Sequence, residues 1–462
     1  MAVPRGSIFW ALLLISIGAL FLWANIDPTV RPWYLIGRYW PILIIFWGLS
    51  KLVDYLLLRG TPEASRAARL GAGDIIGLIF ILLLGTAITR ITRRDFWNGV
   101  VGVAIEDEDW ARWFGNRYEF TEKLEQEIKT PAVLNLVNRR GSVTVVAQPG
   151  DRIQASIRKT IFAPDEAEAA RRARELEVTL EPVASGYELR WKTPPEVRGL
   201  ARVDLELHVP AHLGTKLETR RGDVRVTGLT GDVNISLGTG NAEVTGITGN
   251  VQVQVRSGDV RVDNVTGNVE IRGRGDEIDV REVRGQANID GEFTGPIRAS
   301  KIDQQTRFLS QRTNFTAERI AGRLELIRGE LNLRGVAGNV TLLAQDKDIY
   351  MDALEGQVRI ESQRGHIQLR CTAPPRQPLE VNSRYGDIEL VLPADSGFAI
   401  EARAAQGEIE TDFTGPKLDL RDEHDVSVLT GQYGTPRVNI RLITRYGSIR
   451  LLRAAPATAV SF

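Results

Sequence analysis

The sequence predicts two parts: an N-terminal region of two to three transmembrane α-helices, and an all-β domain of the β-solenoid type. Two observations lead to this fold class. Ile8–Asn25 reads IFWALLLISIGALFLWAN, eighteen residues without a charge, which is long enough to span a bilayer. From Gly222 to Gly267, a Gly-Asp or Gly-Asn pair recurs every nine residues, with alternating β-branched residues between the pairs. Such a short fixed period is typical of a solenoid, whose units bury their apolar faces only against one another.

The membrane region is predicted to occupy residues 1–95, with spans at about 8–25, 40–58 and 71–88. A signal peptide is the alternative for the first span. Against it, two more apolar segments follow, and no small-residue cleavage pattern precedes a soluble domain. The third segment has an uncharged core of only about fourteen residues, so it either spans or lies at the interface.

The second apolar segment contains two charged residues, Lys51 and Asp54, three positions apart. One interpretation is a buried polar site inside the membrane. The interpretation we favour is a pair at the interface, where a long side chain extends to water.

The side of the membrane that the β-domain faces is not decided by charge. Arginines flank the apolar segments in nearly equal numbers on the two sides, so the positive-inside rule gives no orientation. Three spans with the N-terminus in the cytoplasm would place the β-domain outside, and a chain with a single cysteine suits that location. We therefore expect an integral membrane protein whose β-domain lies outside the cytoplasm; the resemblance described below implies that the membrane is the bacterial cell membrane.

The repeat defines the β-domain. Three to five residues of period-two alternation follow each glycine pair, which is the pattern of a short half-buried strand. Glycine is expected to supply a positive φ, and Asp or Asn the turn that follows. The unit is therefore one short strand and one turn, and the pairs begin at Gly222, Gly231, Gly240, Gly249, Gly258 and Gly267.

The remaining residues are assigned by composition. Residues 96–132 are predicted to be a juxtamembrane linker, 133–215 an irregular first part of the β-domain, and 216–454 the repetitive solenoid, followed by a tail at 455–462. One helix is expected at about 164–178, because PDEAEAARRARELEV begins with proline and acids and continues with arginines, which suits the helix dipole.

Composition excludes several kinds of site. The 58 basic and 58 acidic residues cancel, which gives no reason to expect a nucleic-acid partner. The single cysteine, Cys371, excludes an intrachain disulfide framework and a cysteine-rich zinc site. His208 and His212 have the i, i+4 spacing of a helical metal site, but Pro210 lies between them and the preceding residues alternate like a strand, so no metal is expected there.

Several short motifs have a structural explanation. The repeat itself generates Arg-Gly-Asp at Arg221-Gly222-Asp223 and Arg274-Gly275-Asp276, so we do not expect integrin binding. The calcium-binding nonapeptide pattern is absent, and turn capping is the role expected for the recurrent aspartates, which are Asp223, Asp232, Asp259 and Asp276.

The outward positions of the repeat offer basic residues but no catalytic set. Arg225, Arg256, Arg261 and Arg272 either bind an anionic polymer or lipid headgroups, or form an ordinary charged face that prevents edge aggregation, which we favour. No catalytic, cofactor-binding or metal-binding residues are predicted, and we expect no cofactor and no enzymatic activity.

Two segments resemble known families. RYWPILIIFWGLSKLVDYL (38–57) resembles the membrane hairpin of Lia-type proteins of bacterial envelope-stress systems. LNLVNRRGSVTVVAQPGDRIQASIRKT (134–160) and VDLELHVPAHLGTKLETRRGDVRVTGLTGDV (203–233) resemble the adhesin-type, toast-rack β-domain found behind such hairpins. The resemblance implies a right-handed solenoid-like β-domain, linked to envelope-stress sensing or surface interaction, and implies no catalytic residues.

The function we expect is that of a non-enzymatic, membrane-anchored scaffold, adhesin-like, that presents a repetitive surface. Its expected partners are the lipid bilayer and either an envelope polymer or a stress-response protein. The alternative is a signalling component of Lia or Psp type that senses envelope stress. A carbohydrate-active β-helix enzyme is the least favoured interpretation, because no carboxylates cluster in the sequence as that chemistry requires.

Overall fold

The computed structural model describes residues 18–19, 22, 116–128, 133–191 and 201–454. The predicted spans at 8–25, 40–58 and 71–88 lie outside this part of the chain, apart from Gly18, Ala19 and Leu22. Within the described residues, no helix combines the length and the apolar character that crossing a membrane requires.

The contacts divide the chain into two compact units. The smaller comprises Met1–Phe120, Thr160–Glu177 and Lys192–Arg202, and the larger comprises Thr121–Lys159, Val178–Trp191 and Val203–Phe462.

In the smaller unit, the described residues include one helix, α6 (Glu166–Glu175), inside the range 164–178 for which the sequence predicts a helix. The carboxylate of the N-cap residue Asp165 accepts a hydrogen bond from the backbone N–H of Glu168 at 2.8 Å. Acidic residues in the first turn and arginines in the last turn complement the helix dipole.

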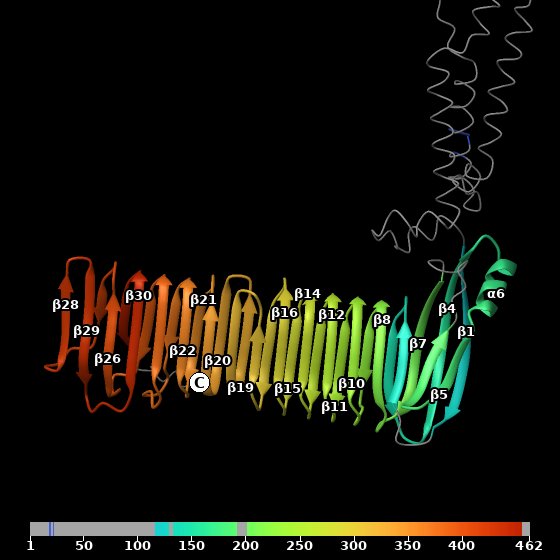
Figure 1. Ribbon diagram of the computed structural model, residues 1–462, viewed down its shortest axis with the longest axis horizontal. Coiled ribbons are helices and arrows are strands. Elements are labelled where there is room, and N and C mark those ends of the chain that lie inside the picture. Colours follow the sequence, from blue (N-terminus) through green and yellow to red (C-terminus); the bar gives the residue numbers. More distant parts are fainter. Residues whose placement is uncertain (1–17, 20–21, 23–115, 129–132, 192–200, 455–462) are drawn as a thin grey trace, which may run out of the picture. The chain divides into compact units, whose positions relative to one another are not determined.

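The described residues form 31 strands, most of which build two faces of the larger unit (Figure 1). Face 1 is the ladder β6 (Gly186–Trp191), β2 (Val133–Asn138), β8 (Gly214–Arg221), β10 (Val233–Thr239), β12 (Val251–Ser257), β14 (Val269–Gly275), β16 (Ala287–Phe293), β18 (Thr306–Leu309), β19 (Thr313–Ile327), β20 (Glu330–Ala344), β22 (Val358–Arg364), β24 (Leu379–Tyr385), β30 (Asn439–Tyr446), β26 (Phe398–Ala404), β29 (Val426–Tyr433) and β28 (Leu418–Glu423).

Face 2 is the ladder β7 (Ala201–Pro210), β3 (Val143–Gln148), β9 (Val224–Thr227), β11 (Ala242–Ile247), β13 (Val260–Val265), β15 (Ile278–Val283), β17 (Ile297–Ile302), the other halves of β19 and β20, β21 (Asp348–Leu354), β23 (Ile367–Arg370), β25 (Ile388–Leu392), β31 (Ile449–Arg453) and β27 (Ile409–Thr411). The other strands are β1 (Asn116–Glu127), β4 (Arg152–Ala163) and β5 (Val178–Val183). Residues 116–127, where the sequence predicts a linker, thus form a strand. Its side chains are mostly exposed, so the sequence has little apolar periodicity there to indicate a strand.

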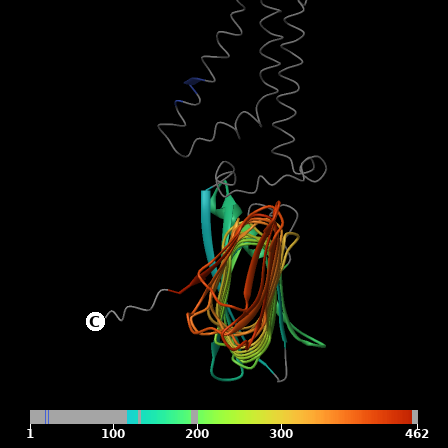
Figure 2. The same cartoon turned by 90° about the vertical axis from the view of Figure 1, so that its left-hand side faces the viewer.

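Each coil of the solenoid contains one strand of each face, so its true period is twice the sequence repeat. Val233 pairs with Val251 and Val251 with Val269, eighteen residues apart, while Ala242 pairs with Val260 on the other face. The inward residues of both faces are buried and meet in one continuous core. Viewed end-on, successive coils superpose as one flattened outline (Figure 2). The predicted β-solenoid is therefore confirmed for this part of the chain.

The coil direction reverses at β19. β19 runs antiparallel to β17 and β18, crosses both faces, and returns through an antiparallel hairpin into β20. After β20, parallel coiling resumes. The irregular sequence between the two regular stretches is this reversed coil.

The described strands that come last in the sequence, β30 and β31, do not lie at the end of the solenoid. β30 lies between β24 and β26, and β31 lies between β25 and β27. The exposed end of face 1 is formed instead by the antiparallel strands β29 and β28. β28 has the sequence LDLRDE, whose charges suit an edge strand that must not pair with another sheet.

The repeated glycines serve different purposes at the two turn edges. Gly240 and Gly258 have φ values of +135° and +126°, as predicted. Gly249 and Gly267 are not among the residues with positive φ. A Cβ atom at either of them would lie 2.6 or 2.4 Å from a backbone oxygen of the preceding coil. At that edge, glycine is therefore required by the close approach of coils rather than by backbone conformation.

Candidate functional site

The outward side chains of face 2 form columns in which charge alternates from coil to coil. The parallel register places Arg225 beside Glu243, Glu243 beside Arg261, and Arg261 beside Asp279. The next strand continues the column with Arg298. Because residues paired in register lie directly opposite each other, opposite charges face each other along the column.

These neighbours form ion pairs. Arg225 Nη2 lies 2.8 Å from a carboxylate oxygen of Glu243, and Arg261 Nε lies 3.9 Å from Asp279. Asp279 is only 3% exposed and also contacts Arg281 on its own strand. The Asp279 carboxylate raises the pKa of Arg281, chiefly through their hydrogen bond.

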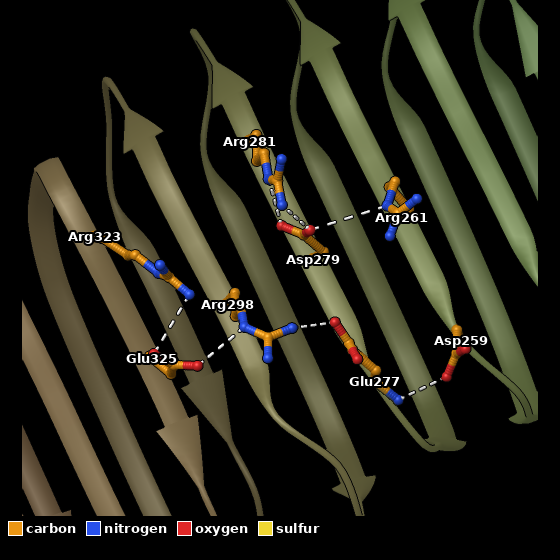
Figure 3. A network of polar contacts seen from close by, with 8 residues as sticks. All are labelled: Asp259, Arg261, Glu277, Asp279, Arg281, Arg298, Arg323 and Glu325. Carbon is orange, nitrogen blue, oxygen red and sulfur yellow. Dashed lines mark hydrogen bonds and ion pairs between the residues drawn. The ribbon is translucent and has the colours of Figure 1, made fainter.

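Arg298 links the parallel coils to the reversed coil (Figure 3). Its guanidinium contacts Glu277 on one side and lies 3.0 Å from Glu325 of β19 on the other. Arg323 contacts the same Glu325 at 3.4 Å. The hydrogen bond to Glu325 makes the largest contribution to raising the pKa of Arg298. The charged network therefore continues across the place where the coil direction changes.

The turns beside face 2 are joined by a ladder of side-chain oxygens. The backbone N–H of Asn241 donates to Oδ1 of Asp223 at 2.8 Å, that of Asp259 to Asn241 at 2.9 Å, and that of Glu277 to Asp259 at 3.0 Å. Asp223 and Asp259 thus cap turns, as predicted, but each caps the turn of the next coil, eighteen residues further on. The side chain of Asp276 instead accepts a hydrogen bond from the hydroxyl of Thr294 at 2.9 Å. Asp223, part of one Arg-Gly-Asp sequence, is engaged in this way.

The opposite turn edge carries an equivalent ladder. Asp232, Asn250 and Asn268 each accept the backbone N–H one coil further on, at 2.8, 3.0 and 2.9 Å. These oxygens, which are of the type that binds calcium, are therefore used to fix the spacing of the coils. Within the described residues, no group of three or more His, Cys, Asp or Glu side chains is arranged to hold a metal ion.

Strands β9, β11, β13 and β15 enclose a hollow of about 320 Å³ on face 2. Both arginines and carboxylates line it, among them Arg225, Glu243, Arg261 and Asp279. Its lining contains two guanidinium groups and five carboxylates, those of Asp223, Glu243, Asp259, Glu277 and Asp279, so the hollow has an excess of negative charge. Such a surface suits a partner that carries positive charge better than a polyanion.

The four arginines noted in the sequence do not form one patch. Arg225 and Arg261 lie on face 2, whereas Arg256 and Arg272 lie at outward positions of face 1, where Arg272 contacts Glu270. The carboxylate partners of Arg225 and Arg261 follow from the period of eighteen, whereas Arg272 pairs within its own strand. No feature of the sequence indicates that Glu325, which lies on the reversed strand β19, forms an ion pair with Arg298.

The remaining polar candidates lie apart. His208 is on β7 with Nε2 3.4 Å from Glu206, and His212 lies in the turn after Pro210. Cys371 is 1% exposed, and burial raises the pKa of its thiol to about 11, which keeps the thiol protonated.

Comparison with known proteins gives one family. The model of the Toastrack DUF4097 family matches residues 204–452. No curated protein matches the chain. Among solved structures, the chain is similar to a "putative cell adhesion protein" from Clostridium sporogenes, at 9% identity over 72% of this chain and 100% of the other, with a TM-score of 0.17. It is also similar to a "putative adhesin" from Bacteroides fragilis, at 10% identity over 72% and 97%, with a TM-score of 0.23. At these identities and TM-scores, neither likeness carries information on function.

Proposed function

Since this chain belongs to the Toastrack DUF4097 family, we propose that it is a non-enzymatic scaffold whose β-solenoid presents a repetitive charged surface, in the manner of an adhesin. The partner is an envelope component or another protein. The observation that carries the proposal is the ion-paired outer face. Its charges recur in register from coil to coil and pair between coils, so the surface is both periodic and held in place.

Rigidity is what such a surface requires. The inward residues of successive coils are buried, and side-chain ladders at both turn edges fix the coil spacing. A surface whose side chains are already ordered loses little conformational freedom when a partner binds. Because charges of both signs are paired along this face, the surface favours selectivity and correct orientation over general attraction to polyanions.

The N-terminal residues 1–95 supply a membrane anchor in this proposal. The apolar segment Ile8–Asn25 has the length of a spanning helix. The protein then resides in the bacterial cell membrane, with the solenoid on the extracytoplasmic side. The bilayer is one partner, and the envelope component or protein that contacts the solenoid is the other.

Single-cysteine labelling tests this location. Gln254 lies at an exposed outward position of face 1, and its side chain makes no ion pair or hydrogen bond within the described residues. In a Gln254→Cys variant, a membrane-impermeant maleimide should label intact cells. The unaltered chain, which holds only the buried Cys371, should be labelled only after denaturation. Labelling of Gln254→Cys only after the cells are lysed would place the solenoid in the cytoplasm and refute surface presentation.

The second candidate is an envelope-stress signalling component of Lia or Psp type, favoured by the sequence of residues 38–57. In that case the solenoid docks a regulator. Crosslinking from face 2 positions in cells with and without membrane stress distinguishes the two functions. A partner captured only under stress supports signalling, and one captured equally in both conditions supports a constitutive scaffold.

A further inference from the structure

Two copies of one short motif meet on face 1. Arg384-Tyr385-Gly386 ends β24 and Arg445-Tyr446-Gly447 ends β30. Although they are 61 residues apart in sequence, Tyr385 and Tyr446 are paired in register because β30 lies against β24. Arg364, at the end of β22, is the register partner of Tyr385 on the other side. We refer to Arg364, Arg384, Tyr385, Arg445 and Tyr446 as the arginine–tyrosine edge.

The two tyrosines orient the arginines. Their rings stack with centroids 4.7 Å apart and planes 7° from parallel. The guanidinium of Arg384 lies 5.4 Å from the Tyr385 centroid, and that of Arg445 lies 5.3 Å from the Tyr446 centroid. These are cation–π distances, which reduce the mobility of both arginine side chains. Tyr385 remains 39% exposed, so the edge is open to a ligand.

The arginines of this edge differ from those of face 2. Arg298 and Arg225 are bound to glutamates. Within the part of the chain that the structure describes, Arg364, Arg384 and Arg445 have no carboxylate partner at ion-pair distance. Guanidinium groups that are ordered but not neutralised are suited to binding a carboxylate or another oxyanion.

A groove of about 460 Å³ begins at Arg384 and extends over the turn before β19 and the ends of β20 and β22. Five amide side chains line it: Gln311, Asn314, Gln345, Gln363 and Asn382. Among the described residues, the side-chain amides of Asn314, Gln363 and Asn382 make no hydrogen bond, so they are available to a ligand.

Three further lining residues bear on the chemistry of the groove. Glu361 is its carboxylate and is already bound by Arg359 at 2.9 Å. Arg312 adds a second guanidinium beside Arg384. Leu343, 40% exposed, supplies an apolar contact. The groove therefore combines free amides, two guanidinium groups and one aliphatic surface.

This set of groups matches one class of ligand. Amides both donate and accept hydrogen bonds, as sugar hydroxyls do, whereas guanidinium only donates and therefore requires an anionic or carbonyl oxygen. The tyrosine ring faces are occupied by each other and by arginine, which disfavours the base stacking that single-stranded nucleic acids need. Lipid insertion would need more exposed apolar surface than Leu343 and the ring edge provide.

We propose that the groove and the arginine–tyrosine edge bind an acidic polysaccharide, with hydroxyls on the amides and carboxylates on Arg384 and Arg445. This inference rests on the proposed scaffold function, because it gives the chemical class of the envelope component that the solenoid contacts. The two can nevertheless fail separately: the labelling of Gln254→Cys depends on location alone, and binding to the purified chain depends on the groove alone.

The test measures binding of the full chain to polygalacturonate by titration calorimetry. Its methyl ester serves as a ligand with the same sugar and no charge. Binding of polygalacturonate, with at least about tenfold weaker binding of the ester, is expected from the loss of charge-assisted hydrogen bonds. Equal binding of acid and ester, or no binding of either by the folded chain, would overturn the proposal.

Variants locate the binding. The double variant Arg384→Gln/Arg445→Gln should lower affinity for polygalacturonate about tenfold or more. Arg256→Gln/Arg274→Gln is the matched control, since both arginines are exposed near strand ends of face 1 without an ion pair in the described residues. It should change affinity less than about twofold. Equal loss in both variants would mean non-specific charge attraction and would refute the site.

A third variant separates a sugar site from a simple anion site. Asn382→Ala keeps every arginine and should still weaken polygalacturonate binding about threefold to tenfold through the loss of hydrogen bonds. An unchanged affinity in Asn382→Ala would exclude the groove. The chain could also bind single-stranded RNA or anionic phospholipid vesicles more tightly than polygalacturonate. If Arg384→Gln/Arg445→Gln abolished that binding, the polysaccharide proposal would be refuted. Circular dichroism of each variant verifies that the solenoid is folded.

Discussion

Replacement of Gly258 by alanine should destabilise the solenoid more than replacement of either Gly246 or Gly249. Gly258 has φ +126°, and a Cβ atom on it would lie 1.9 Å from the carbonyl oxygen of Gly240 in the preceding coil. Contacts under 3.0 Å essentially never occur for real Cβ atoms, so the coils would have to separate by more than 1 Å. Two penalties therefore act at one position.

Each penalty has a typical size. An L-residue forced into this backbone region costs about 1–3 kcal/mol, and overpacking costs about 1–3 kcal/mol more. We therefore expect a loss of about 2–6 kcal/mol in the free energy of unfolding, less about 0.4–1 kcal/mol because alanine restricts the unfolded chain.

Two other glycines separate these penalties. Gly249→Ala introduces a contact of 2.6 Å with the oxygen of Gly231 without a positive φ, so it should cost about 1–3 kcal/mol. Gly246 has φ +70°, and the nearest atom to its Cβ would be 3.8 Å away, so Gly246→Ala should cost only the backbone term of about 1–2 kcal/mol.

The assay combines denaturant unfolding of the full chain, followed by far-UV circular dichroism, with amide hydrogen exchange. A solenoid can open locally, so exchange shows whether the loss is confined to the neighbouring coils. The reasoning is refuted if Gly258→Ala is no more destabilising than Gly246→Ala, or if Gly249→Ala has no effect.

Three further predictions concern the ladder, the charged network and the thiol. Asn250→Ala should lower the free energy of unfolding by about 0.5–1.5 kcal/mol and speed hydrogen exchange of the Asn268 amide, which loses its acceptor. Asn250→Asp keeps the acceptor and serves as the control. Slow exchange in the alanine variant would contradict the ladder. Arg298→Gln should lower the free energy of unfolding by about 1–2 kcal/mol, because the carboxylates of Glu277 and Glu325 lose their partner, and by less at high salt. Denaturant unfolding measures this loss, and a loss that does not depend on salt would argue against the network. The thiol of Cys371 has an ordinary pKa of 9.0 and a folded pKa of about 11, so its contribution to stability is complete below pH 9 and is lost as the pH rises through 11. Alkylation at pH 8 should follow unfolding, and rapid alkylation of the folded chain would contradict this burial.

The likeness to the toast-rack β-domain was accessible from the sequence, and the family match to residues 204–452 confirms it. The Lia-type likeness depends on residues 38–57, outside the described part of the chain. The nine-residue repeat predicted strands, turns and stacking correctly. It could not show that consecutive strands belong to opposite faces, because a strand and a turn look alike in sequence on either face.

For the candidate sites too, the sequence indicates some of the residues but not how they pair. Arg225 and Arg261 could be selected from the sequence as outward residues of the repeat. Their neutralisation by Glu243 and Asp279 requires the eighteen-residue register. A prediction of positive φ for every repeated glycine was wrong at Gly249, where backbone approach is the cause.

The β-solenoid follows from local sequence, because a short period of glycine pairs and alternating apolar residues leaves few other ways of burying the apolar side chains. The reversal of the coil at β19 and the insertion of β30 beside β24 become visible only in the folded chain. Both depend on pairing between segments distant in sequence, where many registers satisfy the same local alternation. That pairing brings Tyr385 and Tyr446 together and thereby assembles the proposed saccharide site.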